Sequence, residues 1–266
     1  MEKLYNLKII KSGNRIEIYK YHGYMKEGTE GKNKEGRKGK GEVTKDKKEI
    51  NRRETLYKAR NNIVRIISCN EDMQTFITLT YADNMQDLKQ SKKHINYFFK
   101  KLTKDYPKLK YIYVLEFQER GAIHYHILCS IKLNIKTSES KKYKPKAQKE
   151  LENYFRVNYW SNRGFVDIRN LESEGITNVA KYVSAYLVED LLKLDLEGHR
   201  AYGYSLNINR PIIEKVDIKA GNADILEQYK DEYKMTYSSQ YQVHYIDKNG
   251  QERESNVYYY DLMKDV

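Results

Sequence analysis

The chain has 266 residues, and its 49 Lys and Arg residues outnumber its 37 Asp and Glu residues, which gives a formal net charge of +12. This excess indicates a polyanionic partner, of which nucleic acid is the commonest. No apolar run approaches the roughly 20 residues of a spanning helix, and the first residues lack a signal-peptide core, so we expect a cytoplasmic protein without membrane contact. Cys69 and Cys129 fit no metal spacing, which predicts two thiols.

The first 50 residues predict a hairpin followed by a linker. Residues 1–24 contain two alternating runs on either side of Ser12-Gly13-Asn14, which is typical of an N-terminal β-hairpin. Residues 25–50 are rich in Gly, Lys and Glu with few apolar side chains, which predicts a basic flexible linker. Because no Gly-Lys-Ser/Thr sequence follows a predicted strand, we expect no nucleotide cofactor and no helicase activity.

Residues 51–215 carry the patterns of an α+β domain. Apolar spacing and strand propensity predict its elements in chain order: helix 51–68, strand 74–81, helix 85–102, hairpin 111–128, helix 147–160, strand 164–168 and helix 176–193. The segment from 198 to 216 is expected to be a loop. Residues 216–266 form a C-terminal extension, which ends in two predicted strands around the turn signal Asn249-Gly250.

The predicted hairpin at Tyr111–Leu128 carries two histidines separated by one residue. Side chains alternate along a strand, so His124 and His126 share one face. Glu116 lies on the neighbouring strand, and whether it shares that face depends on the register, since a slip of one residue would turn it away. Two imidazoles and one carboxylate predict a three-ligand site for Mg²⁺ or Mn²⁺. The alternative is two half-buried histidines that bind nothing.

Two tyrosines on the last predicted helix lie on one helical face. Tyr182 and Tyr186 are four residues apart, so their side chains are one turn from each other. In a chain with 26 tyrosines such a pair is often simple packing. The other interpretation is that they are nucleophiles, because a tyrosine hydroxyl forms a covalent intermediate when a metal or a base activates it.

Three sequence blocks together resemble those of the HUH endonucleases, and more closely the rolling-circle replication initiators of small plasmids and single-stranded DNA phages. The blocks are FITLTY at Phe76–Tyr81, HYH at His124–His126 and AKYVSAY at Ala180–Tyr186. Residues 5–21 and the segment SLNINRPI also resemble such replication proteins, so the resemblance covers most of residues 5–213. It implies an HUH endonuclease fold, with a central antiparallel sheet and flanking helices, over residues 51–215.

The resemblance also implies a reaction and its residues. A Mg²⁺ or Mn²⁺ ion held by His124, His126 and Glu116 would polarise the scissile phosphate, and Tyr182 or Tyr186 would attack it to leave a covalent 5'-phosphotyrosine. The expected substrate is single-stranded or hairpin origin DNA, and a host helicase and DNA polymerase are expected as indirect partners. Further DNA contacts are expected from five residues: Thr78, Thr80, Lys181, Arg200 and Arg210.

One departure from the initiators leaves alternatives open. Initiators usually have a lysine three residues after a catalytic tyrosine, whereas this chain has Ala185 and Glu189 at those positions. The departure leaves the choice of nucleophile open, with Tyr182 favoured because it lies in the best-matching part of its block. It also leaves room for a protein that binds origin DNA without cutting it. A transposase or conjugative relaxase would use the same chemistry.

Overall fold

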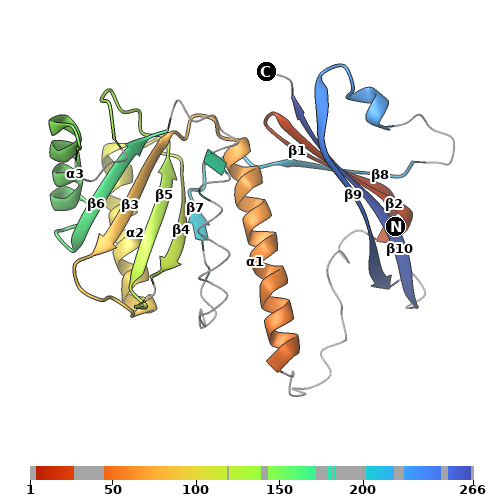
Figure 1. Ribbon diagram of the computed structural model, residues 1–266, viewed down its shortest axis with the longest axis horizontal. Helices are drawn as coiled ribbons and strands as arrows, with labels where there is room; N and C mark the ends of the chain where they lie inside the picture. The colour runs from red at the N-terminus through yellow and green to blue at the C-terminus, as the bar shows by residue number, and fades with distance from the viewer. Residues whose placement is uncertain are drawn as a thin grey trace. The chain divides into compact units, whose positions relative to one another are not determined.

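The computed structural model describes an α+β protein, in agreement with the predicted class (Figure 1). The described residues form two five-stranded antiparallel sheets and three α-helices. They are residues 4–26, 45–118, 120–138, 143–171, 179–180, 183, 200, 202–218, 225–246 and 251–264. The chain divides into two compact units, which we call unit 1 (Met1–Val43 with Arg210–Val266) and unit 2 (Thr44–Asn209).

Unit 1 is a sheet that joins the two ends of the chain. Its strands lie in the order β8-β1-β2-β10-β9, and their bounds are β1 (Leu4–Ser12), β2 (Arg15–Lys26), β8 (Ile212–Val216), β9 (Tyr233–Ile246) and β10 (Glu252–Lys264). A short 3₁₀ helix, η2 (Ile225–Gln228), adds Ile225 to a core with Leu7, Ile18 and Leu262. A two-stranded hairpin alone is marginally stable, and pairing β2 with β10 gives it the further strands it needs.

Unit 2 has the predicted histidine hairpin at the centre of its sheet. The strand order is β6-β3-β5-β4-β7, with bounds β3 (Thr75–Tyr81), β4 (Tyr111–Phe117), β5 (Ile123–Cys129), β6 (Gly164–Asn170) and β7 (Tyr202–Tyr204). All seven residues of β5 are buried. The two histidines therefore stand on a strand that is hydrogen-bonded on both sides and fixed by its neighbours.

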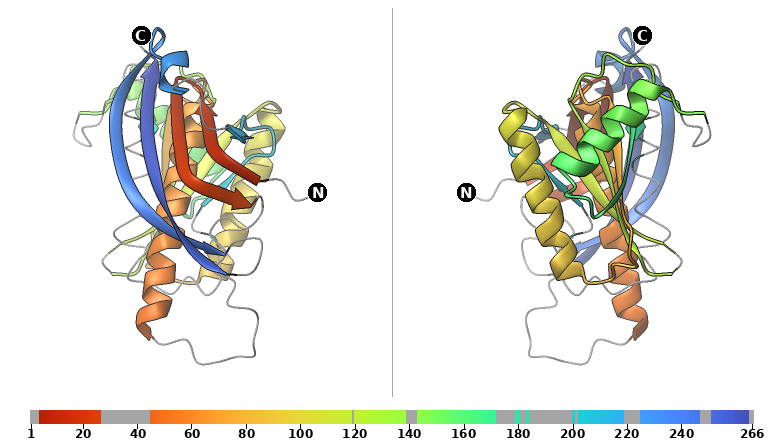
Figure 2. Two further views of the ribbon diagram at one scale, coloured as in Figure 1. Left: turned by 90° about the vertical axis from the view of Figure 1, so that its right-hand side faces the viewer. Right: turned by 90° about the vertical axis from the view of Figure 1, so that its left-hand side faces the viewer.

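Three helices pack on this sheet: α1 (Lys45–Ser68), α2 (Leu88–Asp105) and α3 (Lys146–Asn158). Helix α2 contacts the face that carries Tyr125 and Tyr111, through a Ser91–Tyr125 hydrogen bond and a Phe99–Tyr111 ring stack. Helix α1 contacts the other face, where Asn62 Nδ2 donates to Tyr202 Oη at 2.8 Å. Helices α1 and α2 thus lie on opposite faces (Figure 2), and α3 packs beside β6.

The predicted elements agree with these bounds except at a few ends. Helix α1 begins at Lys45, inside the segment expected to be linker, where Lys and Glu are good helix formers. Helix α2 begins after Asp87, whose side chain caps it by accepting from Gln90 N at 2.9 Å. The prediction of a loop over 198–216 is wrong, because β7 and β8 pair there with β4 and β1.

Two further expectations concern the chain's turns and thiols. Gly13 has a φ of 58°, which fits the predicted turn of the first hairpin, while Asn249-Gly250 lies outside the described residues. Cys69 and Cys129 are both thiols, and burial raises the pKa of Cys129 to about 12, which keeps it protonated and unreactive. None of the helices in the described part of the chain combines the length and hydropathy that a membrane crossing requires.

Candidate functional site

The strand register of unit 2 brings polar side chains into one row across its sheet. His124 on β5 is paired with Glu116 on β4 and with Thr80 on β3, and Thr80 is paired with Phe165 on β6. Directly paired residues of an antiparallel sheet project to the same face. These four side chains therefore share the face that carries His124, which is the face opposite α2.

A second row runs beside the first, two residues further along each strand. His126 is paired with Thr78 on β3, and Thr78 is paired with Asp167 on β6. On the other side of His126 the paired residue is Val114, which is fully buried. The face therefore changes from polar to apolar between β5 and the inner part of β4, and the hydrophilic area lies toward β3, β6 and the end of β4.

The register places Glu116 against both histidines, which answers the question that the sequence leaves open. Glu116 Oε2 lies 2.7 Å from His126 Nε2 and 3.9 Å from His124 Nδ1. The imidazoles are buried, with side-chain exposures of 9% for His124 and 6% for His126, whereas Glu116 retains 20%. Three donor groups thus converge at the edge of the buried sheet, where one of them still reaches solvent.

The second nitrogen of His126 is held by Thr78. Thr78 Oγ1 lies 3.3 Å from His126 Nδ1, and the imidazole also stacks on the Phe76 ring. When Nε2 carries the proton and donates to Glu116, the Thr78 hydroxyl donates to Nδ1. When Nδ1 carries the proton and donates to Thr78, Nε2 presents a lone pair on the Glu116 side, which is the form that ligates metals. Thr78 supports either tautomer and fixes the ring plane.

The donor set fits a hard divalent cation in its chemistry. Two ligands at right angles with bonds of about 2.1 Å lie about 3 Å apart, and the two N–O distances at Glu116 fall on either side of that value. Within the described residues, no three His, Cys, Asp or Glu side chains already surround a common point. A cation at this place would therefore take the position of the direct His126–Glu116 contact.

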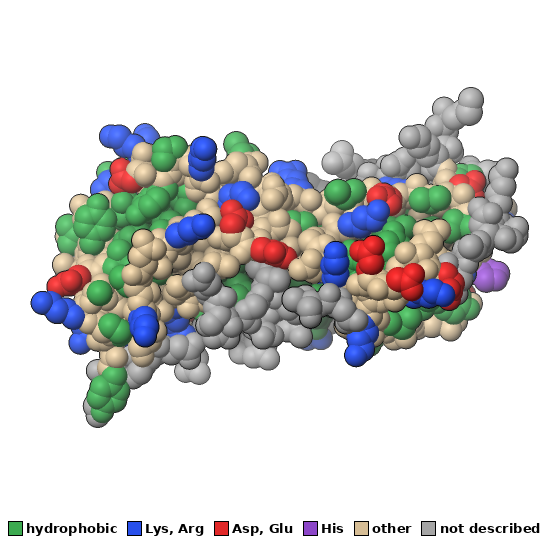
Figure 3. Space-filling view, turned by 90° about the horizontal axis from the view of Figure 1, so that it is seen from above, with side chains coloured by type: hydrophobic (Ala, Val, Ile, Leu, Met, Phe, Trp, Pro, Cys, Tyr) green, Lys and Arg blue, Asp and Glu red, His purple; other side chains and the backbone are tan. Residues whose placement is uncertain are grey.

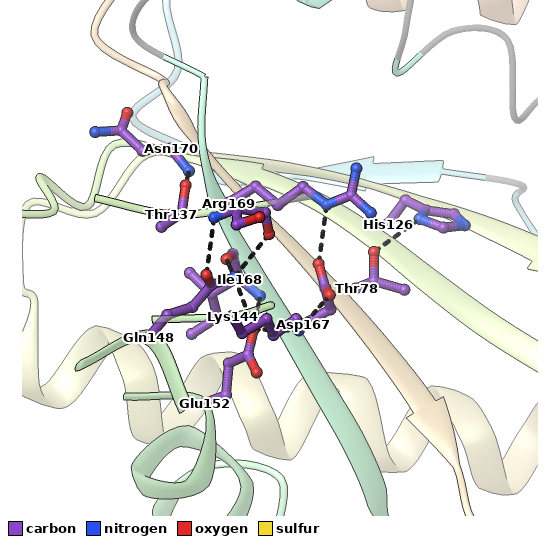
Figure 4. A network of polar contacts seen from close by, with 11 residues as sticks. Thr78, His126, Thr137, Lys144, Gln148, Glu152, Asp167, Ile168, Arg169 and Asn170 are labelled. Carbon is purple, nitrogen blue, oxygen red and sulfur yellow. Dashed lines mark hydrogen bonds and ion pairs between the residues drawn. The ribbon is translucent and has the colours of Figure 1, made fainter. Parts of the chain in front are cut away.

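An ion network lies next to the histidine rows (Figure 4). Lys144 Nζ donates to Glu152 Oε1 of α3 and to Asp167 Oδ2 of β6, both at 2.6 Å, and Arg169 Nε donates to Asp167 Oδ1 at 3.0 Å. Burial opposes the charge of Lys144, but its hydrogen bonds to Asp167 and Glu152 raise its pKa above the usual value. The network joins the segment before α3 to the strand that borders the histidine face.

Removal of the central cation of this network is expected to destabilise unit 2. Lys144 is only 11% exposed, so Lys144→Met leaves two carboxylates facing each other with little solvent and should cost about 3 kcal/mol at pH 7. Urea unfolding followed by the fluorescence of Trp160, the one tryptophan of the chain, measures this loss. Lys146→Met is the control, because Lys146 is 91% exposed and its ion pair with Glu150 contributes little.

The pH dependence of that difference follows from the raised pKa of Lys144. Its contribution is fully present below the ordinary value of 10.5 and is lost as the pH rises through the raised folded-state value. In the variant, protonation of a carboxylate near pH 4 relieves the repulsion. The difference between the two proteins should therefore be largest around neutral pH and shrink toward pH 4. An equal difference at pH 4 and pH 7 would contradict this account.

A cavity of about 540 Å³ opens on the polar rows. Its lining includes both histidines, Thr78, Thr80, Arg120 and Phe165, together with the ion network. The volume falls within the range of about 300–1,000 Å³ that is usual for ligand sites. The structure therefore brings together five of the residues that the sequence predicts for the site: Glu116, His124, His126, Thr78 and Thr80.

The other predicted site residues are not brought to this cavity by the described structure. Arg200 is an exposed residue of unit 2, and Arg210 is an exposed residue of unit 1. Lys181, Tyr182 and Tyr186 lie outside the described residues. Val179, Ala180 and Val183 of the same predicted helix are helical and buried in the core of unit 2, as expected for its apolar stripe.

Sequence reasoning missed several side chains that line the cavity. Phe165, Asp167 and Arg169 alternate along β6 with the buried Val166 and Ile168, so their period of two was a usable signal. Lys144 and Arg120 had no such signal, because each stands in a segment without a repeating pattern. On the face that Figure 3 shows, Lys and Arg side chains are interspersed with Asp and Glu, so the net positive charge does not form one patch there.

Comparison with known proteins adds one match. Residues 74–191 are similar to a family of replication-associated proteins of the ORF2 type. The matched stretch contains β3 to β6, both histidines, Glu116 and the two candidate tyrosines. No curated protein and no solved structure matches the chain. The matched region is thus that of a replication-associated class of protein, in agreement with the expected association with DNA replication.

Proposed function

We propose that the protein initiates rolling-circle DNA replication by nicking and rejoining one DNA strand, as an endonuclease of the HUH type. The observation that carries this proposal is the approach of Glu116 to His124 and His126, within the stretch that is similar to replication-associated proteins. The net charge of +12 supports a nucleic-acid substrate. Its substrate is single-stranded or hairpin origin DNA, with a host helicase and polymerase as indirect partners.

The chemistry divides between a metal site and a tyrosine. His124, His126 and Glu116 would hold Mg²⁺ or Mn²⁺, which when bound supplies a Lewis acid for the scissile phosphate. The Oη of Tyr182 or Tyr186 attacks the phosphorus as the bond to the 3'-oxygen breaks, the phenol loses its proton and the 3'-oxygen gains one. The products are a 5'-phosphotyrosine and a free 3'-hydroxyl that primes synthesis. Because the new bond is a phosphodiester, reversal rejoins the strand without ATP.

A denaturing gel tests the proposal. Purified protein is incubated with Mn²⁺ or Mg²⁺ and an oligonucleotide from its own origin, labelled on the 3' side of the expected nick. The label should be retained on the protein band and should disappear from it in EDTA. A label that never becomes protein-bound in either metal, on an oligonucleotide that the protein binds tightly, would refute the nuclease.

A second candidate is a protein of the same fold that binds origin DNA without cutting it. The observation that favours it is the pair Ala185 and Glu189, which replaces the lysines that usually follow the catalytic tyrosines of initiators. In that case restoring lysine at these two positions is the first change to make. A transposase or relaxase would give the same gel as an initiator, and the order of the sequence blocks favours the initiator.

A further inference from the structure

We propose that the exposed ring of Phe165 stacks on one unpaired nucleobase next to the scissile phosphate. The inference rests on the proposed function for its choice of substrate and adds a nucleotide-binding subsite to it. The subsite consists of the outer part of β6, the turn between β4 and β5, and the cavity between them. Three observations support it: an exposed aromatic ring, a fixed turn that carries an arginine, and a balanced set of charges on the cavity wall.

Phe165 is a large apolar side chain in an unusual position. It is 69% exposed, whereas Val166 and Ile168 on the same strand are buried. Its paired residue is Thr80, which is itself paired with His124, so the ring stands two strands from the histidine within one row. An aromatic face beside a catalytic row offers a stacking surface to any base, because every base has a π face.

The turn between β4 and β5 presents Arg120 on the cavity from a fixed backbone. The Arg120 carbonyl accepts from Gln86 Nε2 at 2.9 Å and from Asn84 Nδ2 at 3.3 Å. Gly121 has a φ of +80°, and a Cβ there would meet Gln86 Nε2 at 3.1 Å, so the turn requires glycine and Gln86 packs closely on it. The exposed guanidinium of Arg120 is therefore suited to hold the phosphate that follows the stacked base.

The cavity wall on β6 does not repel a polyanion. Asp167 and Glu152 each contact Lys144, and Arg169 contacts Asp167, so two carboxylates are matched by two cations. The wall is thus polar and close to neutral. Attraction to phosphate then depends on Arg120, and attraction to the base depends on Phe165, which makes the two contributions separable by mutation.

Fluorescence of 2-aminopurine tests the stacking directly. The probe is a short single-stranded oligo(dT) with one 2-aminopurine, which suits a subsite whose stacking tolerates any base. The measurement is made in EDTA, so that binding is observed without cleavage. Phe165→Leu should weaken binding about 5- to 100-fold and relieve the quenching, whereas Phe165→Trp should retain both. Tyr97→Leu is the control, since Tyr97 is an exposed aromatic residue of α2, on the opposite face of the sheet.

The outcomes separate this subsite from the proposed reaction. Unchanged affinity and quenching in Phe165→Leu would overturn the subsite, even in a protein that forms the covalent adduct. Quenching that depends on Phe165 in a protein that forms no adduct would support the subsite and refute the nuclease. Arg120→Gln should weaken binding and reduce its salt dependence while leaving the quenching of bound probe unchanged. Equal binding of duplex DNA, with the same dependence on Phe165, would also contradict an unpaired base as the ligand.

Discussion

Replacement of both His124 and His126 by alanine is expected to abolish nicking of supercoiled origin DNA. The two imidazoles supply two of the three donor groups at Glu116, and a single carboxylate at the end of a strand holds a divalent cation weakly. The loss should therefore be complete in Mg²⁺ and in Mn²⁺. Conversion of supercoiled to open-circular DNA, followed on agarose, measures it.

Controls for this result need to separate chemistry from folding, because both histidines are buried. His244→Ala removes a histidine of β9 that is 72% exposed in its side chain, and it should nick as the unchanged protein does. The double variant should still quench the 2-aminopurine probe in EDTA, since Phe165 and Arg120 remain. Full nicking by a double variant with normal circular dichroism would refute the assignment of the metal ligands.

A variant with Tyr182→Phe and Tyr186→Phe is expected to form no covalent adduct while still binding the labelled oligonucleotide. Phenylalanine keeps the ring and removes only the hydroxyl that would become the phosphodiester oxygen, so any packing role survives. The comparison of each single variant with the double variant identifies the nucleophile. We expect the larger loss from Tyr182→Phe, because that tyrosine lies in the best-matching part of its sequence block.

The matched control for the tyrosines is Tyr154→Phe. Tyr154 lies on α3, is 50% exposed and does not line the histidine cavity, so its variant should form the adduct normally. Adduct formation by the double phenylalanine variant would show that another group is the nucleophile. It would leave the assignment of Glu116, His124 and His126 standing.

The sequence was sufficient for the histidine face but not for its surroundings. Alternation alone predicts that His124 and His126 share a face, because a strand has a period of two whatever it is paired with. The position of Glu116 required the register, which depends on the geometry of the turn at Gly121 and on its contact with Gln86. That contact joins residues far apart in the chain and leaves no local pattern.

The parts that sequence reasoning did not find all depend on pairings between distant segments. Strands β7 and β8 are short, and each is held by one neighbouring strand, so nothing in the loop-like sequence at 198–216 indicates them. Lys144 looks like one more solvated lysine until Glu152 and Asp167 are brought to it by α3 and β6. Such contacts arise from tertiary packing, which local propensity does not encode.

The joining of both chain ends in unit 1 has a consequence for synthesis on the ribosome. Unit 2 is a continuous segment, and its sheet can form as soon as residue 209 has emerged. Unit 1 cannot close until β10 emerges, because β10 lies between β2 and β9 and completes the sheet begun by the first strands. Domains generally fold in the order of their synthesis. The histidine-bearing unit should therefore be folded while the strands β1 and β2 still await their final partners.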